Sequence, residues 1–504
     1  MERKWWTLIA VCVATFMLLL DITVVNTALP SIRKDLHSSF TDLQWVVDAY
    51  ALTLAAFVLT SGSLADRLGR KRVFVIGVAI FTLASLFCGL AGSPTVLNVS
   101  RAVQGVGGAA MFAVSLALLA QEWRGADRAT ATAIYGATIG VAVALGPLVG
   151  GALTQAIGWQ SIFFLNIPVG IAAIAVTVLK VAESRDETAR GVDWGGTITF
   201  SAANGLLVLA LLRGNDDGWT SSVIIALIAA AIALFVVFVA IELRIAQPML
   251  PLGLFRSHAF TGAQITAFAL SGSMFALFLY ITLYMQEIEH LSPLQAGLRY
   301  LPFTFGTFLV AGGTASLEGK VAPRVLLSGG LAITAIGLLL MSGAKPDDSW
   351  TVLLPGFIVG GIGVGLVNPV LANVALSSVP ERMSGVASGI NDTFRQVAIA
   401  SGTAGLGALF LALSQQRIEH LLPGVSGDRA RGLAEAASSG SLPHNTPASV
   451  LSAAREGFTH GFSVILIVGS GLAFLGAVLA LWLVRDGDLR HEEVVELAAE
   501  RVAA

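Results

Sequence analysis

Charged residues are scarce in this chain of 504 residues, since Asp, Glu, Lys and Arg together make up only 12% of it. An average soluble domain is about 25% charged, so this scarcity excludes the ordinary soluble globular class. Hydrophobic residues reach 55%, and apolar runs recur along the whole chain. Each run is close to the roughly 20 residues that a helix needs to cross a bilayer. The composition therefore predicts an all-α protein that crosses a membrane many times.

Several kinds of chemistry are also missing from the sequence. The two cysteines, Cys12 and Cys88, both lie inside apolar runs, and they indicate neither a disulfide framework nor a metal cluster. The phosphate-binding string Gly-x4-Gly-Lys-Ser/Thr is absent, because Gly319 and Lys320 are followed by Val321. A net charge of −2 does not favour a nucleic-acid partner. We therefore expect no metal, no cofactor and no enzyme activity, and a secondary transporter driven by an ion gradient remains.

Apolar runs bounded by charges or by Gly and Pro predict fourteen membrane-spanning helices. The opening "MERKWW" is followed by no small-residue cleavage site, so we expect an uncleaved first helix. With the N-terminus placed inside, nineteen of the 30 basic residues fall in cytoplasmic segments and eight in outer segments. Cytoplasmic loops are enriched in Lys and Arg, so both termini are expected in the cytoplasm of a cell. The predicted spans are 6–29, 44–64, 73–92, 97–120, 129–154, 161–181, 195–213, 220–241, 260–286, 294–317, 325–343, 350–372, 385–412 and 460–484.

An internal repeat links the two ends of the chain. "GSLADRLGRKRVF" at 62–74 follows the second predicted span, and "SLEGKVAPRVLLSG" at 316–329 follows the tenth. A shift of 252 residues aligns Glu318 with Asp66, Arg324 with Arg72, and Gly329 with Gly77. Transporters are often built from such repeats, with the substrate site at the interface between them.

The repeat predicts two six-helix bundles with two additional helices inserted between them. A long outer connection, residues 413–459, is rich in Ala, Ser, Gly and Pro. Its stretch 428–437 is compatible with a short helix, and either a cap over the outer mouth or a solvated loop would fit. The expected parts are 1–181 for the first bundle, 182–259 for the inserted helices with their linkers, 260–484 for the second bundle, and 485–504 for a cytoplasmic tail.

Four strings occur in order at the expected helices. They are "LDITVVNTALP" at 20–30, "GSLADRLGRKRVF" at 62–74, "RAVQGVGGA" at 101–109 and "GATIGVAVALGPLVGG" at 136–151. Together they resemble the major facilitator superfamily, and with fourteen spans its drug:proton antiporter branch. The resemblance implies alternating access between two bundles in a monomer that exchanges protons for drugs across the lipid bilayer.

Polar residues inside the apolar runs are the candidate site. An ionised Asp21 in the first span costs at least about 2.5–3.5 kcal/mol, so it must face a cavity or a partner, or hold a proton. Asn26 follows on the same helix. Arg101 in the fourth span cannot lose its proton and needs an acceptor, with Gln104 nearby. For Asp21, coupling to protons or gating, a structural hydrogen bond and direct contact with a drug are the alternatives. The resemblance implies proton coupling for Arg101, while an arginine that reaches the interface remains open.

The thirteenth span, "GINDTFRQVAIASG" at 389–402, carries a second set of polar residues. Asp392 and Arg395 are three residues apart and share a helical face, so a local ion pair is one interpretation. A second proton-binding carboxylate is the other. The resemblance carries Arg395 and Gln396 over as polar partners. Glu287 closes the ninth span and is a further candidate for coupling at the outer vestibule.

Two glycine-containing segments suggest moving parts. In the loop after the second span, Gly62 and Gly69 allow close approach, and Asp66 can cap a helix or pair with a facing cation. Arg70 is one of the basic residues expected to anchor the cytoplasmic edge. The resemblance implies a gating latch there. In the fifth span, small residues spaced four apart permit close helix packing, and a proline favours a kink. The resemblance assigns this span to an antiporter helix with Gly146, Pro147, Gly150 and Gly151.

The sequence thus predicts proton-coupled export of amphipathic or cationic drugs and antibiotics. A dedicated exporter of one endogenous product, such as a self-made antibiotic or a lipid, uses the same scaffold and is the alternative. A membrane sensor that transports nothing is a third hypothesis, but it would not need buried charges.

Overall fold

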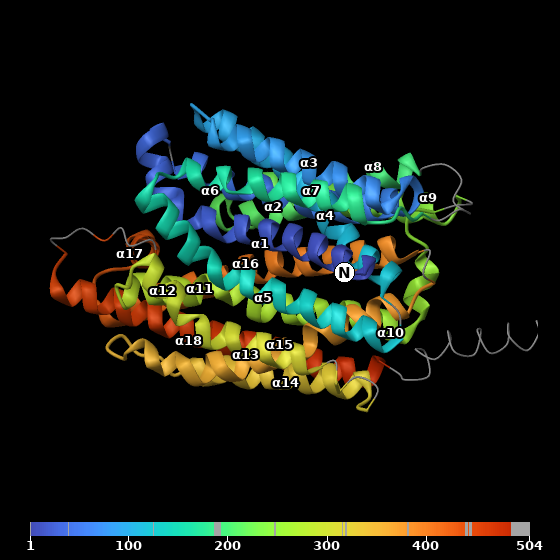
Figure 1. The fold of residues 1–504 in the computed structure, drawn as a ribbon. Coiled ribbons are helices and arrows are strands. Elements are labelled where there is room, and N and C mark those ends of the chain that lie inside the picture. The colour runs from blue at the N-terminus through green and yellow to red at the C-terminus, as the bar shows by residue number, and fades with distance from the viewer. Residues whose placement is uncertain are drawn as a thin grey trace, which may run out of the picture.

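The computed structural model describes residues 2–38, 40–123, 125–185, 193–245, 248–314, 316–317, 320–380, 383–438, 442 and 446–484, apart from a few side chains within these ranges. Throughout these residues the chain is almost entirely helical, and Figure 1 shows the long helices lying side by side along one common direction. Helices satisfy their own backbone N–H and C=O groups, which the interior of a bilayer requires. The predicted all-α membrane class is confirmed.

The first half of the chain forms one bundle around its own apolar core. Local sequence signals set helix boundaries within it. The Ser93 hydroxyl accepts the Val96 N–H at the start of α4, and Gly69, with φ +115°, separates α2 from α3. The helices are α1 (Arg3–Leu36), α2 (Phe40–Leu68), α3 (Arg70–Gly89), α4 (Pro94–Glu122), α5 (Gly125–Ala156), α6 (Gln160–Phe164) and α7 (Asn166–Lys180).

Two inserted helices follow, α8 (Trp194–Asp217) and α9 (Ser222–Glu242). They pack against each other, and α8 also contacts both α2 and α16 (Ser384–Leu421). Polar contacts fix α8 to α2, since the hydroxyls of Thr60 and Ser201 lie 2.7 Å apart. In addition, Asn204 Nδ2 donates to the carbonyl oxygen of Ala55 at 2.5 Å.

The second half forms another bundle with a separate apolar core. Two π-helical turns, Ser271–Phe275 and Tyr284–Ile288, interrupt its first long helical segment, and Pro369 lies inside α15. The helices are α10 (His258–Leu270), α11 (Ala276–Leu283), α12 (Pro293–Arg299), α13 (Leu301–Thr314), α14 (Pro323–Met341), α15 (Leu354–Ser377), α16, α17 (Asp428–Ser438) and α18 (Ala448–Leu483).

Among the described residues, twelve helical segments are long and apolar enough to cross a membrane. They coincide with twelve of the fourteen predicted spans. The predicted spans 129–154 and 294–317 coincide with the shorter apolar segments Thr130–Ala142 and Leu301–Thr314. The count of fourteen therefore stays a prediction, although every predicted span falls on a helix.

The connection at 413–459, which was predicted to lie outside, contains more helix than expected from the sequence. The helix α16 continues to Leu421 and α18 already begins at Ala448, with α17 between them. Ala430 and Ala434 of α17 are buried against Ile418 of α16. The short helix compatible with 428–437 is present, and it packs on the ends of α16 and α18.

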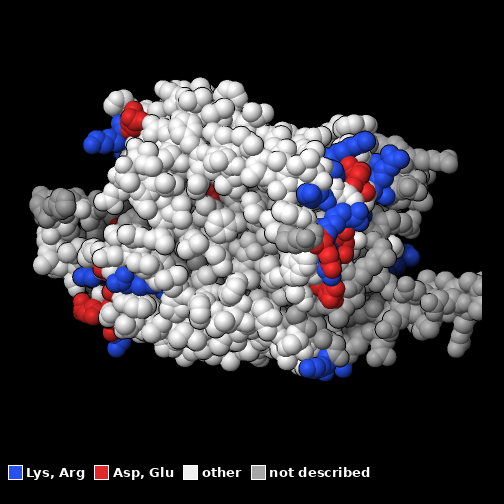
Figure 2. Space-filling view, in the orientation of Figure 1, with Lys and Arg blue, Asp and Glu red and all other residues white. Residues whose placement is uncertain are grey.

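The two halves touch through close backbone contact. A Cβ added to Gly389 of α16 would lie 3.0 Å from the Cα atom of Leu59 in α2, so any side chain here would separate the helices. Figure 2 shows that the charged side chains on this face gather at the two ends of the molecule, with a broad band of other residues between them. This pattern fits an apolar belt inside the bilayer and charged ends in water.

Candidate functional site

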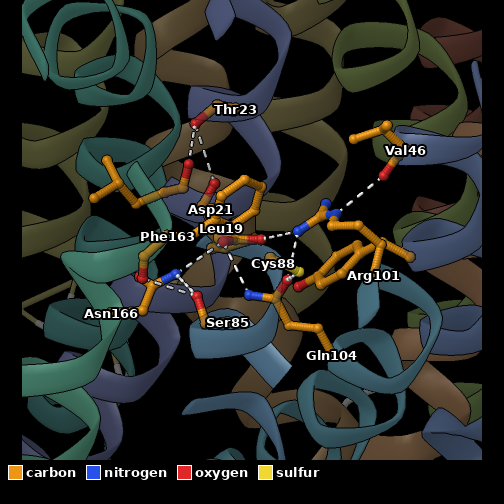
Figure 3. A network of polar contacts seen from close by, with 12 residues as sticks. Leu19, Asp21, Thr23, Val46, Ser85, Cys88, Arg101, Gln104, Phe163 and Asn166 are labelled. Carbon is orange, nitrogen blue, oxygen red and sulfur yellow. Dashed lines mark hydrogen bonds and ion pairs between the residues drawn. The ribbon is translucent and has the colours of Figure 1, made fainter. Parts of the chain in front are cut away.

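Asp21 lies in a buried polar cluster inside the first half (Figure 3). Arg101 Nη1 donates to Asp21 Oδ2 at 2.5 Å. Asp21 Oδ1 accepts hydrogen bonds from Gln104 Nε2 at 3.0 Å and Asn166 Nδ2 at 2.8 Å. Because only 2% of Asp21 and 1% of Arg101 is exposed, each charge depends on the other for compensation.

Arg101 is held by further contacts from α2 and α4. Its Nε donates to the Val46 carbonyl oxygen at 2.9 Å and its Nη1 to Gln104 Oε1 at 2.8 Å. Its guanidinium carbon lies 4.2 Å from the ring centre of Tyr50, an attractive cation–π distance. The alternative that Arg101 extends to the membrane interface is therefore wrong, because its guanidinium is buried and bonded to groups inside the first bundle.

The partners of Asp21 differ from those expected. The side chain of Asn26, the expected polar partner on the same helix, lies outside the described part of the structure. Asn166 was missed, although it is the one polar residue in "FFLNIP" at 163–168. It also donates to the Ser85 hydroxyl at 2.9 Å. Its position as a single polar residue in an apolar run is the signal from which Asn166 could have been predicted.

A second polar cluster lies between the halves, around a small cavity. The cavity has a volume of about 10 Å³, which is room for about one water molecule. The α5 helix of the first half and α15 and α16 of the second half contribute the polar groups. The lining residues are Phe112, Leu116, Tyr135, Gly136, Ile139, Asn368, Ala372, Asn391, Asp392 and Arg395.

Arg395 does not pair with Asp392 in the described part of the chain, so the expected local ion pair is wrong. Its Nε donates to Asn391 Oδ1 and its Nη2 to Asn368 Oδ1, each at 3.1 Å. Asn391 lies one turn before Arg395 on α16, and Asn368 lies on the neighbouring helix α15. These two side chains, rather than Asp392, bind the guanidinium of Arg395. Gln396 is half-buried.

Two buried polar atoms around this cavity have no hydrogen-bond partner among the described residues. They are Oδ2 of Asp392 and Nδ2 of Asn368. Asp392 is 2% exposed and Asn368 is 3% exposed. Buried polar atoms are rarely left unsatisfied without a reason. The arrangement can hold a water molecule, a proton or a small polar group of a substrate.

Sequence reasoning identified Asp392 but missed the two residues that face it. Asn368 stands in "GLVNPVL" at 365–371, where a polar residue next to a proline interrupts an apolar run. That signal was available. Tyr135 carried none, because a tyrosine in an apolar helix is ordinarily core or lipid-facing.

The predicted loop at 62–74 is helical except at Gly69, and the end of α2 joins the two halves at one end of the molecule. Asp66 Oδ1 accepts from Arg70 Nε at 2.8 Å, and its Oδ2 accepts the Val386 N–H at 2.9 Å. Val386 belongs to the first turn of α16, whose N-terminus favours a negative charge. Gly62 is buried within α2. Glu318, aligned with Asp66 in the repeat, lies outside the described residues.

Gly69 makes room for a cap on the next helix. The Glu183 carboxylate accepts the N–H groups of Lys71 at 3.0 Å and Arg72 at 3.2 Å. A Cβ on Gly69 would lie 2.7 Å from the carboxyl carbon of Glu183. The segment that leads into the inserted helices is therefore bound to the same loop.

The glycines of α5 fall into two groups. A Cβ on Gly146 would lie 1.7 Å from Thr23 Oγ1 of α1, and one on Gly150 would lie 2.4 Å from Thr27 Oγ1. These two positions let α5 and α1 touch. Gly151 faces away, where a Cβ would meet only Leu294 N at 3.9 Å. The side chain of Pro147 is outside the described part of the structure.

The Gly146→Ala variant is expected to lose about 1–3 kcal/mol of stability, because the added methyl group overpacks the contact between α1 and α5. Thermal unfolding of the purified protein in detergent measures the effect. Gly151→Ala is the matched control and should stay within about 0.5 kcal/mol of the original protein. Equal losses in both variants would contradict this account of α5.

Glu287 lies away from both polar clusters, in the π-helical turn Tyr284–Ile288 after α11. It is half-buried. Its neighbour Glu289 accepts the N–H of Trp350 at 3.2 Å, and partial burial raises the pKa of the Glu289 carboxyl. These carboxyls lie at the other end of the first long helical segment of the second half from its start at His258.

Two helical halves that meet around a buried polar cavity define a membrane transporter rather than an enzyme. The family model described as Major Facilitator Superfamily matches residues 11–403, and the chain belongs to this superfamily.

Similar proteins agree with this assignment. The tetracenomycin C resistance and export protein of Streptomyces glaucescens is 32% identical over 495 residues, covering 95% of this chain and 91% of the relative. The multidrug resistance protein Stp of Mycobacterium tuberculosis is 34% identical over 500 residues, covering 95% and 92%. The crystal structure of the human organic anion transporter MFSD10 superimposes with a TM-score of 0.61 at 15% identity, covering 95% of this chain and 100% of that one. At that identity the likeness concerns the fold alone.

Proposed function

We propose that this protein exports amphipathic, often cationic drugs or antibiotics from the cytoplasm in exchange for protons. The single observation that carries the proposal is Asp392, a carboxyl buried between the halves with one oxygen unpaired at a cavity. Relatives that cover nearly the whole chain are named as drug resistance and export proteins, which supports the substrate class.

Asp392 suits an exchangeable proton better than Asp21 does. The Asp21 oxygens already accept hydrogen bonds from Arg101, Gln104 and Asn166, so its charge is compensated in place. The nearest cation to Asp392, Arg395, is bonded to two asparagine oxygens instead. Asp392 can therefore bind a proton or, when the cavity opens, a cationic substrate. Asp21 and Arg101 then hold the helices of the first half in the geometry needed for coupling.

Alternating access explains why the cavity is so small. Room for about one water molecule cannot admit a drug, so the structure corresponds to a closed stage in which the halves meet on both sides of Asp392. Opening toward the cytoplasm must break the contact between Asp66 and the N-terminus of α16. The glycines of α5 and the latch loop serve this movement, and Glu287 is a candidate for receiving protons from outside.

We further propose that the protein acts as a monomer in the cell membrane with both termini in the cytoplasm. The excess of Lys and Arg in alternate connections supports this orientation. The Asp66 contact then lies on the cytoplasmic side.

Drug susceptibility of cells that express the protein tests this function. We expect resistance to several unrelated amphipathic compounds, and we expect an uncoupler that collapses the proton gradient to remove it. Cells carrying the Asp392→Asn variant at equal membrane abundance are the control. Resistance that survives the uncoupler would contradict proton coupling.

A dedicated exporter of one endogenous product remains the second candidate. It is favoured by the relative whose name joins resistance with export of a single antibiotic. The same screen separates the two, because resistance confined to one compound indicates a dedicated exporter.

A further inference from the structure

A pair of buried carboxyl groups lies at the base of the inserted helices, outside both polar clusters described above. Asp193 precedes α8 and is 4% exposed, and Glu242 ends α9 and is 5% exposed. A Cβ on Gly196 would lie 2.4 Å from Asp193 Oδ2 and 2.6 Å from Glu242 Oε1. The two carboxyl oxygens therefore lie within about 5 Å of each other.

Both carboxyl groups also accept hydrogen bonds from a short segment of backbone at 249–250. Asp193 Oδ1 accepts the Gly196 N–H at 2.8 Å, and its Oδ2 accepts the Met249 N–H at 3.3 Å. Glu242 Oε2 accepts the Leu250 N–H at 3.3 Å. Glu242 Oε1 has no hydrogen-bond partner among the described residues, and it faces Asp193.

Among the described residues, the cations on the neighbouring segments are not buried together with the pair. Asp193 is the charged group that acts most strongly on Glu242. Arg244, Arg256 and His258, on the segments next to the pair, are exposed. Two buried carboxylates this near to each other repel, and one proton held by the pair removes that repulsion.

The residues on α2 that face this region take part in other contacts. Asp66 is bonded to Arg70 and to the Val386 N–H. Arg67 Nη2 donates to the carbonyl oxygen of Pro248 at 3.2 Å.

The same segment is thus connected to the junction between the halves. Pro248 directly precedes Met249, whose N–H the pair accepts, and Arg67 directly follows Asp66. One continuous set of contacts leads from the carboxyl pair through 248–250 and Arg67 to the contact between Asp66 and α16.

We propose that Asp193 and Glu242 form a proton-operated lock that sets how firmly the cytoplasmic junction of the two halves is closed. With one proton shared, the carboxyls stay together and hold the 248–250 segment. At higher cytoplasmic pH that proton passes to water, the two carboxylates repel, and the segment with its Arg67 contact loosens. The role in transport rests on the proposed function: proton entry acidifies the cytoplasm, which closes the lock and limits further entry.

Hydrogen exchange of the full-length protein in detergent, read by mass spectrometry on the peptide that spans 248–250, tests the lock without any transport. After correction for intrinsic rates, protection of this peptide is expected to fall by about tenfold or more between about pH 6 and about pH 9. In Glu242→Gln and, independently, in Asp193→Asn the protection should not depend on pH. Asp217→Asn, an exposed carboxyl at the other end of α8, is the matched control and should follow the original protein.

Protection that is independent of pH in the original protein, or a pH response that persists in both amide variants, would overturn the lock. A second measurement, efflux at several internal pH values, connects the lock to transport, and Glu242→Gln should lose the dependence on internal pH. A pH-dependent peptide in a protein that transports nothing would overturn the proposed function and leave the lock in place. Transport by a protein whose 248–250 peptide shows protection independent of pH would overturn the lock and leave the proposed function in place.

Discussion

Replacing Asp392 with asparagine is expected to lower substrate-driven proton movement in proteoliposomes by about 100-fold or more. Asparagine keeps the size of the side chain but cannot gain or lose the proton. The unpaired Oδ2 between the halves is the atom that would carry it. A pH-sensitive dye inside the vesicles measures the flux after substrate is added.

Two comparisons make this result specific. Asp392→Glu restores a titratable group and should recover part of the flux, while Asp217→Asn should leave it unchanged because that carboxyl is exposed and paired with Arg213. Proton flux that stays at its original level in Asp392→Asn would remove Asp392 from coupling. Asp21 and Glu287 would then be the candidates for the proton-binding carboxyl.

The Asp21→Asn variant is expected to lose about 3–5 kcal/mol of stability, because it leaves the charge of Arg101 buried without its counterion. The same loss of geometry should abolish drug-driven proton movement in protein that still inserts. Thermal unfolding in detergent and the yield of folded protein measure the first effect, and the vesicle assay measures the second.

A double variant separates the charge pair from its surroundings. Asp21→Asn combined with Arg101→Gln removes both charges, so it should be more stable than Asp21→Asn alone. If the two losses simply add, the pair does not act as a unit, and the cluster is held by Gln104 and Asn166 instead.

The two acidic residues identified from the sequence have different surroundings in the fold. Both were expected as costly carboxyls in apolar helices, and the same argument applied to each. Asp21 is sealed inside one half by donors from α4 and α7, whereas Asp392 borders the cavity between the halves. Their roles differ because of where their helices pack, which the cost of burial alone does not show.

The partners of the two carboxyls that the sequence analysis did not identify are uncharged residues. Asn166, Asn368 and Tyr135 complete the two clusters. Asn166 and Tyr135 come from helices distant in the chain from the carboxyl in their cluster, and Asn368 comes from the helix directly before that of Asp392. The sequence did not predict a site at Asp193 and Glu242, because each stands at the end of an apolar run, where a charged side chain is ordinarily exposed to water.

The membrane class and the positions of the helices were readable from the chain alone, although α16 and α18 extend well beyond their predicted ends at 412 and 460. A bilayer requires long apolar runs and backbone groups that bond within one helix, and both are local properties of sequence. The pairing of Asp21 with Arg101, the cavity beside Asp392 and the closeness of Asp193 to Glu242 depend on which helix faces meet. Contacts between distant helices arise from packing and from the balance of buried charge, so only the folded molecule decides them.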